Sequence, residues 1–281
     1  MNNMKRFNIL LVMSAFIGSF TSCSQDAENE LVPSAKVVNF DVNISKTRTV
    51  TEGKVTSFVE DDQIGVFGVK RGASEVLNQN VMYAYTGNGK WLADKSITYP
   101  LDNSPINFYA YYPYGDHPTT NFDFTVLSDQ SKDNGYAQSD LLVAKNEKAL
   151  PGEGAVSLQF GHMMAQIEVK PALPDGVTLT SVALLNVLTG SSVDLINQTA
   201  TTKTDASASL STITLMKAGD VYRGVLPKQT LAGRIFEFVG INEAGQKVMF
   251  DYTLENATAL TANKITCLLY TSPSPRDRQK S

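Results

Sequence analysis

Apolar and polar residues alternate in short runs along most of the chain, and Gly, Asn, Asp and Pro separate these runs. In residues 36–44 every second residue is apolar, and the set comprises Val38, Phe40, Val42 and Ile44. Because strand side chains alternate between two faces, this run predicts a strand with one buried face. No long amphipathic helical stretch follows Cys23. The pattern predicts an all-β fold of the sandwich or barrel type.

The same pattern predicts how the strands are organised. Ile106–Tyr114 (INFYAYYPY) carries apolar or aromatic residues on both faces, which indicates a central strand that ends at Pro113. Two prolines and a glycine interrupt the strand pattern in residues 170–176 (KPALPDG). We therefore predict two β domains, residues 34–170 and 171–266.

The run VSLQFGHMMAQIEV, residues 156–169, changes parity in its middle. Its apolar residues are Val156, Leu158 and Phe160, then Met163, Ala165, Ile167 and Val169. One continuous apolar face requires an extra residue near Gly161–His162, so the run predicts a bulge or a strand that changes sheets. The opposite face would carry His162, Met164, Gln166 and Glu168.

His162 and His117 are the two histidines of the chain. A zinc or copper site needs three or four ligands, and His117 lies in a separate loop, Gly115–Pro118. We therefore expect no metal and no cofactor, and we interpret His162 as a structural histidine with a hydrogen-bonding partner.

The N-terminus has the features of a secretory signal. Lys5 and Arg6 precede an apolar run, residues 7–20, which is short for a bilayer-spanning helix. The tetrapeptide Phe20–Cys23 resembles a bacterial lipobox, although Phe20 replaces the usual leucine. We predict a lipoprotein signal peptide at residues 1–22, lipidation of Cys23 and an acidic tether at residues 23–33. A plain secretory peptide with a chance cysteine is the alternative.

The C-terminal residues 267–281 lack the periodicity of the chain before them. The back-translation of Cys267–Asp277 resembles a transposase sequencing adapter. We therefore expect residues 267–281 to be an adapter-derived tail rather than native protein, with the gene truncated near Thr266. A genuine Pro/Ser-rich basic tail is the alternative.

Charge narrows the functional classes. Residues 23–266 keep 19 of the 24 basic and 27 of the 28 acidic residues, which gives a net charge of −8. Such a chain is poorly suited to binding the phosphate backbone of nucleic acid. The same residues contain no cysteine besides Cys23, which excludes disulfides and thiolate metal sites within them.

Several segments together resemble the fimbrillin, or Mfa-like, family of Bacteroidales. The histidine-containing run resembles the family segment F-x-H-x-x-A-x-[IL]-x-V. Further segments match in family order across residues 34–266, namely DDQIGVF at 61–67, FYAYYPY at 108–114, SDLLVA at 139–144 and VLPKQT at 225–230. The order of these segments is more specific than any one of them.

This resemblance implies two transthyretin-like β-sandwich domains in tandem, the second truncated at its C-terminus. It implies a type V pilus subunit, exported to the outer membrane as a lipoprotein and serving adhesion at the cell surface. In the family, an arginine-directed protease removes an N-terminal strand, and a strand from another subunit fills the groove. Here the removable strand is expected to carry Val38, Phe40, Val42 and Ile44. Arg48 is the expected cleavage site, with Lys46 or Arg71 as weaker choices.

Two other functional classes remain open from the sequence. A surface glycan-binding lipoprotein of a polysaccharide-uptake system could stack sugars on Trp91, Tyr109, Tyr111 or Tyr114. An enzyme could use carboxylate pairs such as Asp61–Asp62 or Asp251 with Glu255, but no nucleophile, zinc or phosphate-loop motif accompanies them. We therefore predict a protein that is not an enzyme. The sequence does not distinguish a shaft, tip or anchor subunit.

Overall fold

The computed structural model describes residues 35–45, 57–205, 208 and 210–270. These residues form 18 strands and one short helix, α1 (Gly135–Ser139). The all-β prediction is therefore confirmed. The signal peptide, Cys23 and the whole acidic tether lie outside the described residues, as do Lys46 and Arg48.

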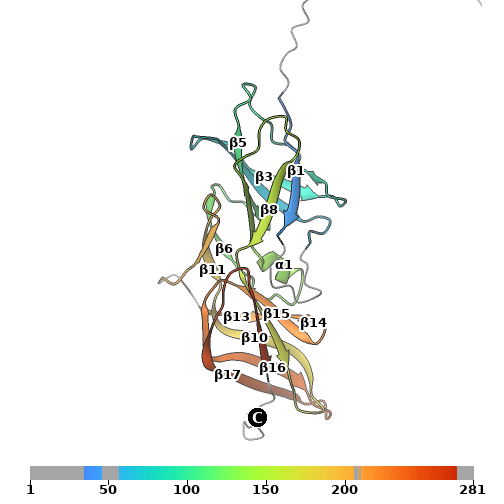
Figure 1. Cartoon of the computed structure of the whole chain (residues 1–281). Helices are drawn as coiled ribbons and strands as arrows, with labels where there is room; N and C mark the ends of the chain where they lie inside the picture. Colours follow the sequence, from blue (N-terminus) through green and yellow to red (C-terminus); the bar gives the residue numbers. More distant parts are fainter. Residues whose placement is uncertain (1–34, 46–56, 206–207, 209, 271–281) are drawn as a thin grey trace, which may run out of the picture. The chain divides into compact units, whose positions relative to one another are not determined.

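The largest sheet has seven strands in the order β1-β8-β7-β5-β2-β3-β4 (Figure 1). Their bounds are β1 (Phe40–Ile44), β8 (Val156–His162), β7 (Leu142–Asn146), β5 (Ile106–Tyr112), β2 (Gln63–Lys70), β3 (Val76–Tyr85) and β4 (Trp91–Leu92). Strand β5 lies in the middle of this order, which confirms the prediction of a central strand. Both of its faces are covered because its aromatic residues alternate between two buried clusters.

The N-terminal segment bonds to β8 and to residues 97–99. β1 pairs with β8 in parallel, while the residues just before β1 bond to the segment that follows β4. The Val38 amide donates to the Ile97 carbonyl at 2.8 Å, and the Tyr99 amide donates to the Lys36 carbonyl at 2.9 Å. The first part of residues 36–45 therefore bonds to residues 97–99 and the later part to β8, so the segment lies between the two.

We call the buried cluster that includes Val38 and Phe40 the first core. Its members share full or nearly full burial, and they are Val38, Phe40, Ile64, Val66, Tyr83, Trp91, Ile97, Tyr99, Ile106, Phe108, Ala110, Tyr112, Leu142, Ala144, Val156, Leu158 and Phe160.

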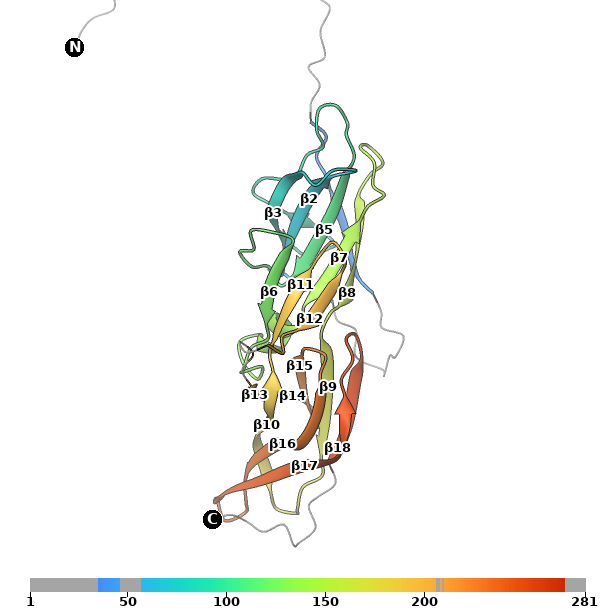
Figure 2. The same ribbon diagram turned by 90° about the vertical axis from the view of Figure 1, so that its left-hand side faces the viewer.

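Three smaller sheets complete the fold (Figure 2). One holds β12 (Thr199–Thr202), β11 (Gly190–Asp194) and β6 (Asn121–Thr125). A second holds β13 (Leu210–Thr214), β10 (Thr178–Leu188), β16 (Thr230–Ile241) and β17 (Lys247–Ala259). The third holds β14 (Met216–Ala218), β15 (Val221–Leu226), β9 (Ala165–Pro171) and β18 (Ile265–Tyr270). Strands from both sides of the predicted boundary at 170/171 share two of these sheets, so the strand pairing is not divided at that position. The two tandem domains stay a prediction.

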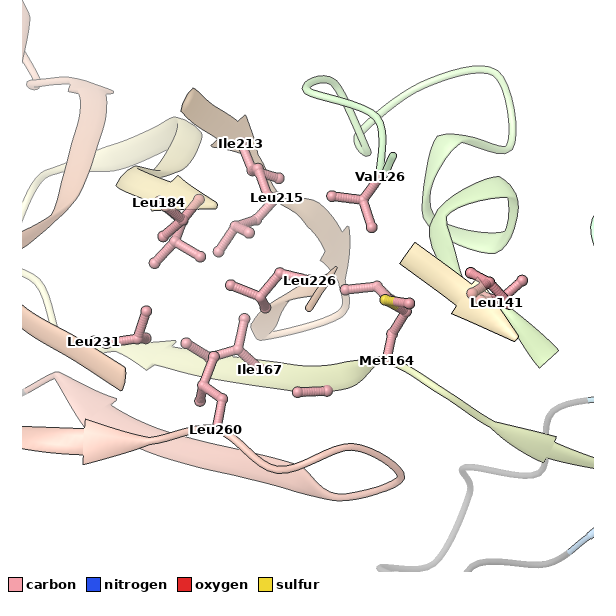
Figure 3. Close-up of a cluster of buried hydrophobic side chains, with 14 of the residues drawn as sticks. Val126, Leu141, Met164, Ile167, Leu184, Ile213, Leu215, Leu226, Leu231 and Leu260 are labelled. Carbon is pink, nitrogen blue, oxygen red and sulfur yellow. The ribbon is translucent and has the colours of Figure 1, made fainter. Parts of the chain in front are cut away.

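A second core lies among these sheets and one face of β5. Figure 3 shows part of it, where Ile167, Leu226 and Leu231 gather from three strands beside Met164. Tyr109 and Tyr111 of β5 belong to this core, whereas Phe108 and Ala110 belong to the first core. Alternation along one strand therefore supplies side chains to two buried clusters.

The parity change at residues 156–169 is a change of sheet, which was one of the two predicted alternatives. β8 lies in the seven-stranded sheet, and β9 lies in the sheet of β14, β15 and β18. Met163 and Met164 form the crossing between them. Met164 is fully buried in the second core, so its expected place on the outward face was wrong. The crossing falls two residues later than expected, and this turns Met164 inward.

β18 contains Cys267 and Leu268, which belong to the tail expected to derive from an adapter. This strand pairs in parallel with β9, from Ile265 opposite Gln166 to Tyr270 opposite Pro171. Residues 271–281 lie outside the described residues. The origin of residues 267–281 stays a prediction.

Candidate functional site

The candidate site is the position that residues 36–45 occupy between β8 and residues 97–99; we call this position the strand slot. Alternation directs Val38 and Phe40 into the first core, where they are 2% and 7% exposed. Val42 and Ile44 point the same way, but they are only half-buried. The four residues expected to form the buried face therefore lie on one face of the segment. Val38 and Phe40 are more deeply buried than Val42 and Ile44.

Phe40 makes the most specific contacts in the slot. Its ring meets the Tyr83 ring edge-on, with centroids 5.1 Å apart, and the Phe108 ring edge-on at 5.4 Å. Edge-on aromatic pairs contribute beyond the area that they bury. Phe40 is therefore the main side-chain anchor of the segment.

The backbone of β1 bonds along one edge of the sheet. Its register with β8 runs from Phe40 opposite Val156 to Ile44 opposite Phe160. The Val156 amide donates to the Asn39 carbonyl at 2.8 Å, and the Ser45 amide donates to the Phe160 carbonyl at 2.7 Å. β1 is a terminal strand in the sheet order, so its loss would expose the β8 edge without dividing the sheet.

Of the basic residues considered for cleavage, the structure describes only Arg71. Its Nε donates to Asn107 Oδ1 at 2.9 Å, and its Nη2 donates to the Ala149 carbonyl at 2.8 Å. These bonds fix the guanidinium between β5 and the loop that follows β7. A protease must withdraw such a side chain before it can bind it, so Arg71 is poorly suited to cleavage.

A buried polar pair lies close to the end of the slot. His162, the last residue of β8, is 6% exposed, and Asp140 is 3% exposed. His162 Nδ1 lies 2.9 Å from Asp140 Oδ2 and 3.0 Å from Oδ1. Burial alone lowers the pKa of His162, but the hydrogen bond and charge of Asp140 outweigh it and raise the pKa. The interpretation of His162 as a partnered structural histidine is confirmed.

His117 has a different environment. Its ring stacks on the Phe122 ring, with centroids 3.9 Å apart and planes 8° apart. Burial lowers the pKa of His117, and nearby Asp116 opposes this only partly. Across the described ranges, no three His, Cys, Asp or Glu side chains gather as metal ligands would.

The aromatic residues considered for sugar stacking are mostly internal. Trp91, Tyr109 and Tyr111 are 8%, 3% and 0% exposed, and each belongs to one of the two cores. Tyr114 is half-buried. Sugar stacking requires an open aromatic face, and the three buried rings do not present one.

Asp62 and Asp251, one from each candidate carboxylate pair, are held by structural partners. Asp62 accepts hydrogen bonds from the Val59 amide at 2.8 Å and from the Tyr112 hydroxyl at 3.0 Å. The first bond stabilises the turn before β2, and the second satisfies a buried hydroxyl in the first core. Asp251 and Glu255 are exposed on β17 with Cα atoms about 13 Å apart, because a strand rises about 3.3 Å per residue. Asp251 also pairs with Arg234 Nη2 at 2.7 Å.

The sequence did not predict that residues 97–99 form the side of the strand slot opposite β8. Ile97 and Tyr99 are 1% and 4% exposed, and Ile97 also bonds through its amide to the Tyr83 hydroxyl at 2.8 Å. Their alternation spans only Ile-Thr-Tyr before Pro100, which is too short to indicate a strand.

The sequence is similar to two fimbrium subunits from Bacteroides species. A relative from Bacteroides ovatus, described as fimbrium tip subunit Fim1C, is 31% identical over 192 residues, which cover 59% of this chain and 35% of that protein. The match thus spans about a third of that relative's length. A relative from Bacteroides uniformis, described as fimbrium subunit Fim1C, is 28% identical over 245 residues, covering 82% and 78%.

Solved structures share the fold. A protein described as a cell adhesion protein from B. ovatus has a TM-score of 0.61 at 17% identity, covering 84% of this chain and 92% of that one. Another, from B. uniformis, has a TM-score of 0.59 at 20% identity, covering 76% and 88%. Within the described ranges, no helix has the length and apolarity needed to cross a bilayer. A family model described as fimbrillin-like matches residues 47–272, and the chain belongs to this family of structural fimbrial subunits, which are not enzymes.

Proposed function

We propose that this protein is a type V pilus subunit that assembles by strand exchange at the strand slot. It is exported as a lipoprotein anchored to the outer membrane through Cys23. Cleavage after Arg48 separates residues 36–45 from the rest of the chain, and an extended strand from another subunit replaces them. The resulting fimbrium serves adhesion at the cell surface.

One observation supports this proposal most strongly. Residues 36–45 bond along sheet edges on both sides, to β8 and to residues 97–99, and they place Val38 and Phe40 in the first core. Their removal would expose unpaired backbone groups and an apolar trough together. An incoming strand satisfies both, because its backbone restores the ladder and its alternate side chains fill the trough.

The chemistry of the slot limits what can enter. Burying one large apolar side chain stabilises by roughly 1.5–3 kcal/mol, so two buried positions hold a strand substantially more tightly than backbone pairing at an open edge. The outward residues of β1 are polar and exposed, including Asp41 and Asn43. The slot therefore suits a segment with alternating apolar residues and a large one at the Phe40 position.

The proposal can be tested with the secreted chain and a second fimbrial subunit that has an intact C-terminal strand. The two are mixed after treatment with an arginine-specific protease, and their oligomers are separated by size and identified by mass spectrometry. We expect a mixed oligomer that lacks residues 36–45 of this chain. If cleavage is complete and no mixed oligomer forms, the assembly mechanism is wrong. The Arg48→Gln variant serves as the uncut control.

A further inference from the structure

The pair of His162 and Asp140 joins three parts of the fold at the crossing between sheets. His162 ends β8, Asp140 directly follows α1, and the Gln166 side chain of β9 donates to Asp140 Oδ2 at 3.2 Å. The Met163 amide donates to the Leu141 carbonyl at 2.8 Å, within one residue of each partner. The pair therefore connects α1, β8 and β9 where the chain leaves one core for the other.

Among the residues that the structure describes, His162 is the one cationic side chain that pairs with Asp140. On α1, Tyr136 is held neutral because burial and the Asp140 charge raise its pKa. On β5, burial and the charge of Asp62, with a smaller contribution from Asp140, raise the pKa of Tyr112. Arg223 and Glu168, which also act on Tyr136, form an ion pair at 2.9 Å between β15 and β9.

We propose that His162 and Asp140 form a proton-dependent latch that holds the crossing between β8 and β9. When the imidazole is protonated, the two buried charges neutralise each other across 2.9 Å. When it is neutral, the Asp140 carboxylate keeps its hydrogen bonds but loses the countercharge of His162, which is its ion-pair partner among the described residues, and a buried lone charge is costly. The crossing is then held less firmly.

The direction of the pH effect follows from linkage. Because the folded protein raises the pKa of His162 above its ordinary 6.5, the latch adds full stability below pH 6.5. This stability is lost as the pH rises through the folded-state value. The contribution of His117 to stability depends on pH in the opposite direction, because burial lowers its pKa and favours the neutral ring. Each histidine is therefore the matched control for the other.

The test is an NMR titration of the two histidine rings in the whole chain between pH 5 and 9, with assignment from the His117→Gln variant. We expect His162 to titrate above 6.5 and above His117, and the Asp140→Asn variant to bring His162 to 6.5 or below. We also expect urea midpoints of the His117→Gln protein to fall as the pH rises through the His162 titration, whereas those of the His162→Gln protein do not.

Two results would overturn the latch. One is a His162 ring that stays neutral down to pH 5, which would make the pair a pH-independent hydrogen bond. The other is a urea midpoint whose pH dependence is the same with and without His162. The titration of the unmodified protein decides the first point even if the Asp140→Asn variant does not fold.

Discussion

The side-chain amide of Gln130 lies against the backbone of Val225 and pairs with it as a neighbouring strand would. Its Nε2 donates to the Val225 carbonyl at 2.7 Å, and its Oε1 accepts from the Val225 amide at 2.8 Å. Gln130 is 1% exposed, so water does not compete for these two hydrogen bonds. One side chain thus satisfies both backbone groups at the edge of β15.

Replacing Gln130 by Ala would leave two buried backbone groups of Val225 unpaired. Since each such group costs roughly 1–3 kcal/mol, we expect the free energy of unfolding to fall by roughly 2–6 kcal/mol in a urea titration. Gln229 is a matched control because its side chain makes the same pair of hydrogen bonds to the backbone of Leu188, at 2.9 and 2.8 Å, in a half-buried position. Gln229→Ala leaves those groups near water, so its loss is expected to be smaller. Equal losses would contradict this account.

Phe40→Ala tests how firmly the first core holds β1. Removing a buried phenylalanine typically costs about 3–5 kcal/mol, because apolar contacts are lost and a cavity remains. We expect a loss in this range by chemical denaturation. The neighbouring Asp41 is exposed on the same strand, and Asp41→Ala is expected to change stability little. If both variants were equally stable, β1 would not be anchored as described.

Gly65 of β2 faces the ring of Tyr111, and a Cβ there would also meet Asn80 Oδ1. Gly65→Ala would displace the Tyr111 hydroxyl, which donates to Asn80 Oδ1 at 2.8 Å. We expect a loss of about 1–3 kcal/mol in thermal or urea unfolding. Gly161→Ala is the control, because nothing lies within 4 Å of its Cβ position. A stability change as large at Gly161 would show that the Gly65 effect is not steric.

Cleavage by an arginine-specific protease is expected to depend on Arg48 and not on Arg71. Arg71 is tied to Asn107 and Ala149, whereas Arg48 follows the edge strand and lies outside the described residues. Under brief digestion, we expect Arg48→Gln to remove the first cut and Arg71→Gln to leave it unchanged. The products are identified by intact mass. A first cut after Arg71 in the unmodified chain would contradict this assignment.

The sequence predicted the features that depend on local alternation. The buried face of β1, the central position of β5 and the change of sheet after His162 all follow from period-two patterns. Local patterns carry no information about partners distant in sequence. The parallel pairing of β1 with β8, the wall at Ile97 and Tyr99, and the bridge from Gln130 to Val225 were therefore not predicted. The place of Met164 was missed because a shift of two residues at a crossing cannot be read from parity alone.

The central claim is that a separate strand can replace residues 36–45, and uptake of a labelled peptide tests it most directly. A fluorescent peptide with the sequence of residues 36–45 is added to the protein before and after cleavage at Arg48, and anisotropy is recorded. We predict saturable uptake by the cleaved protein alone, with clearly weaker uptake of the same peptide carrying Ala at the Phe40 position. No uptake after complete cleavage, or equal uptake by the uncut protein, would contradict the claim.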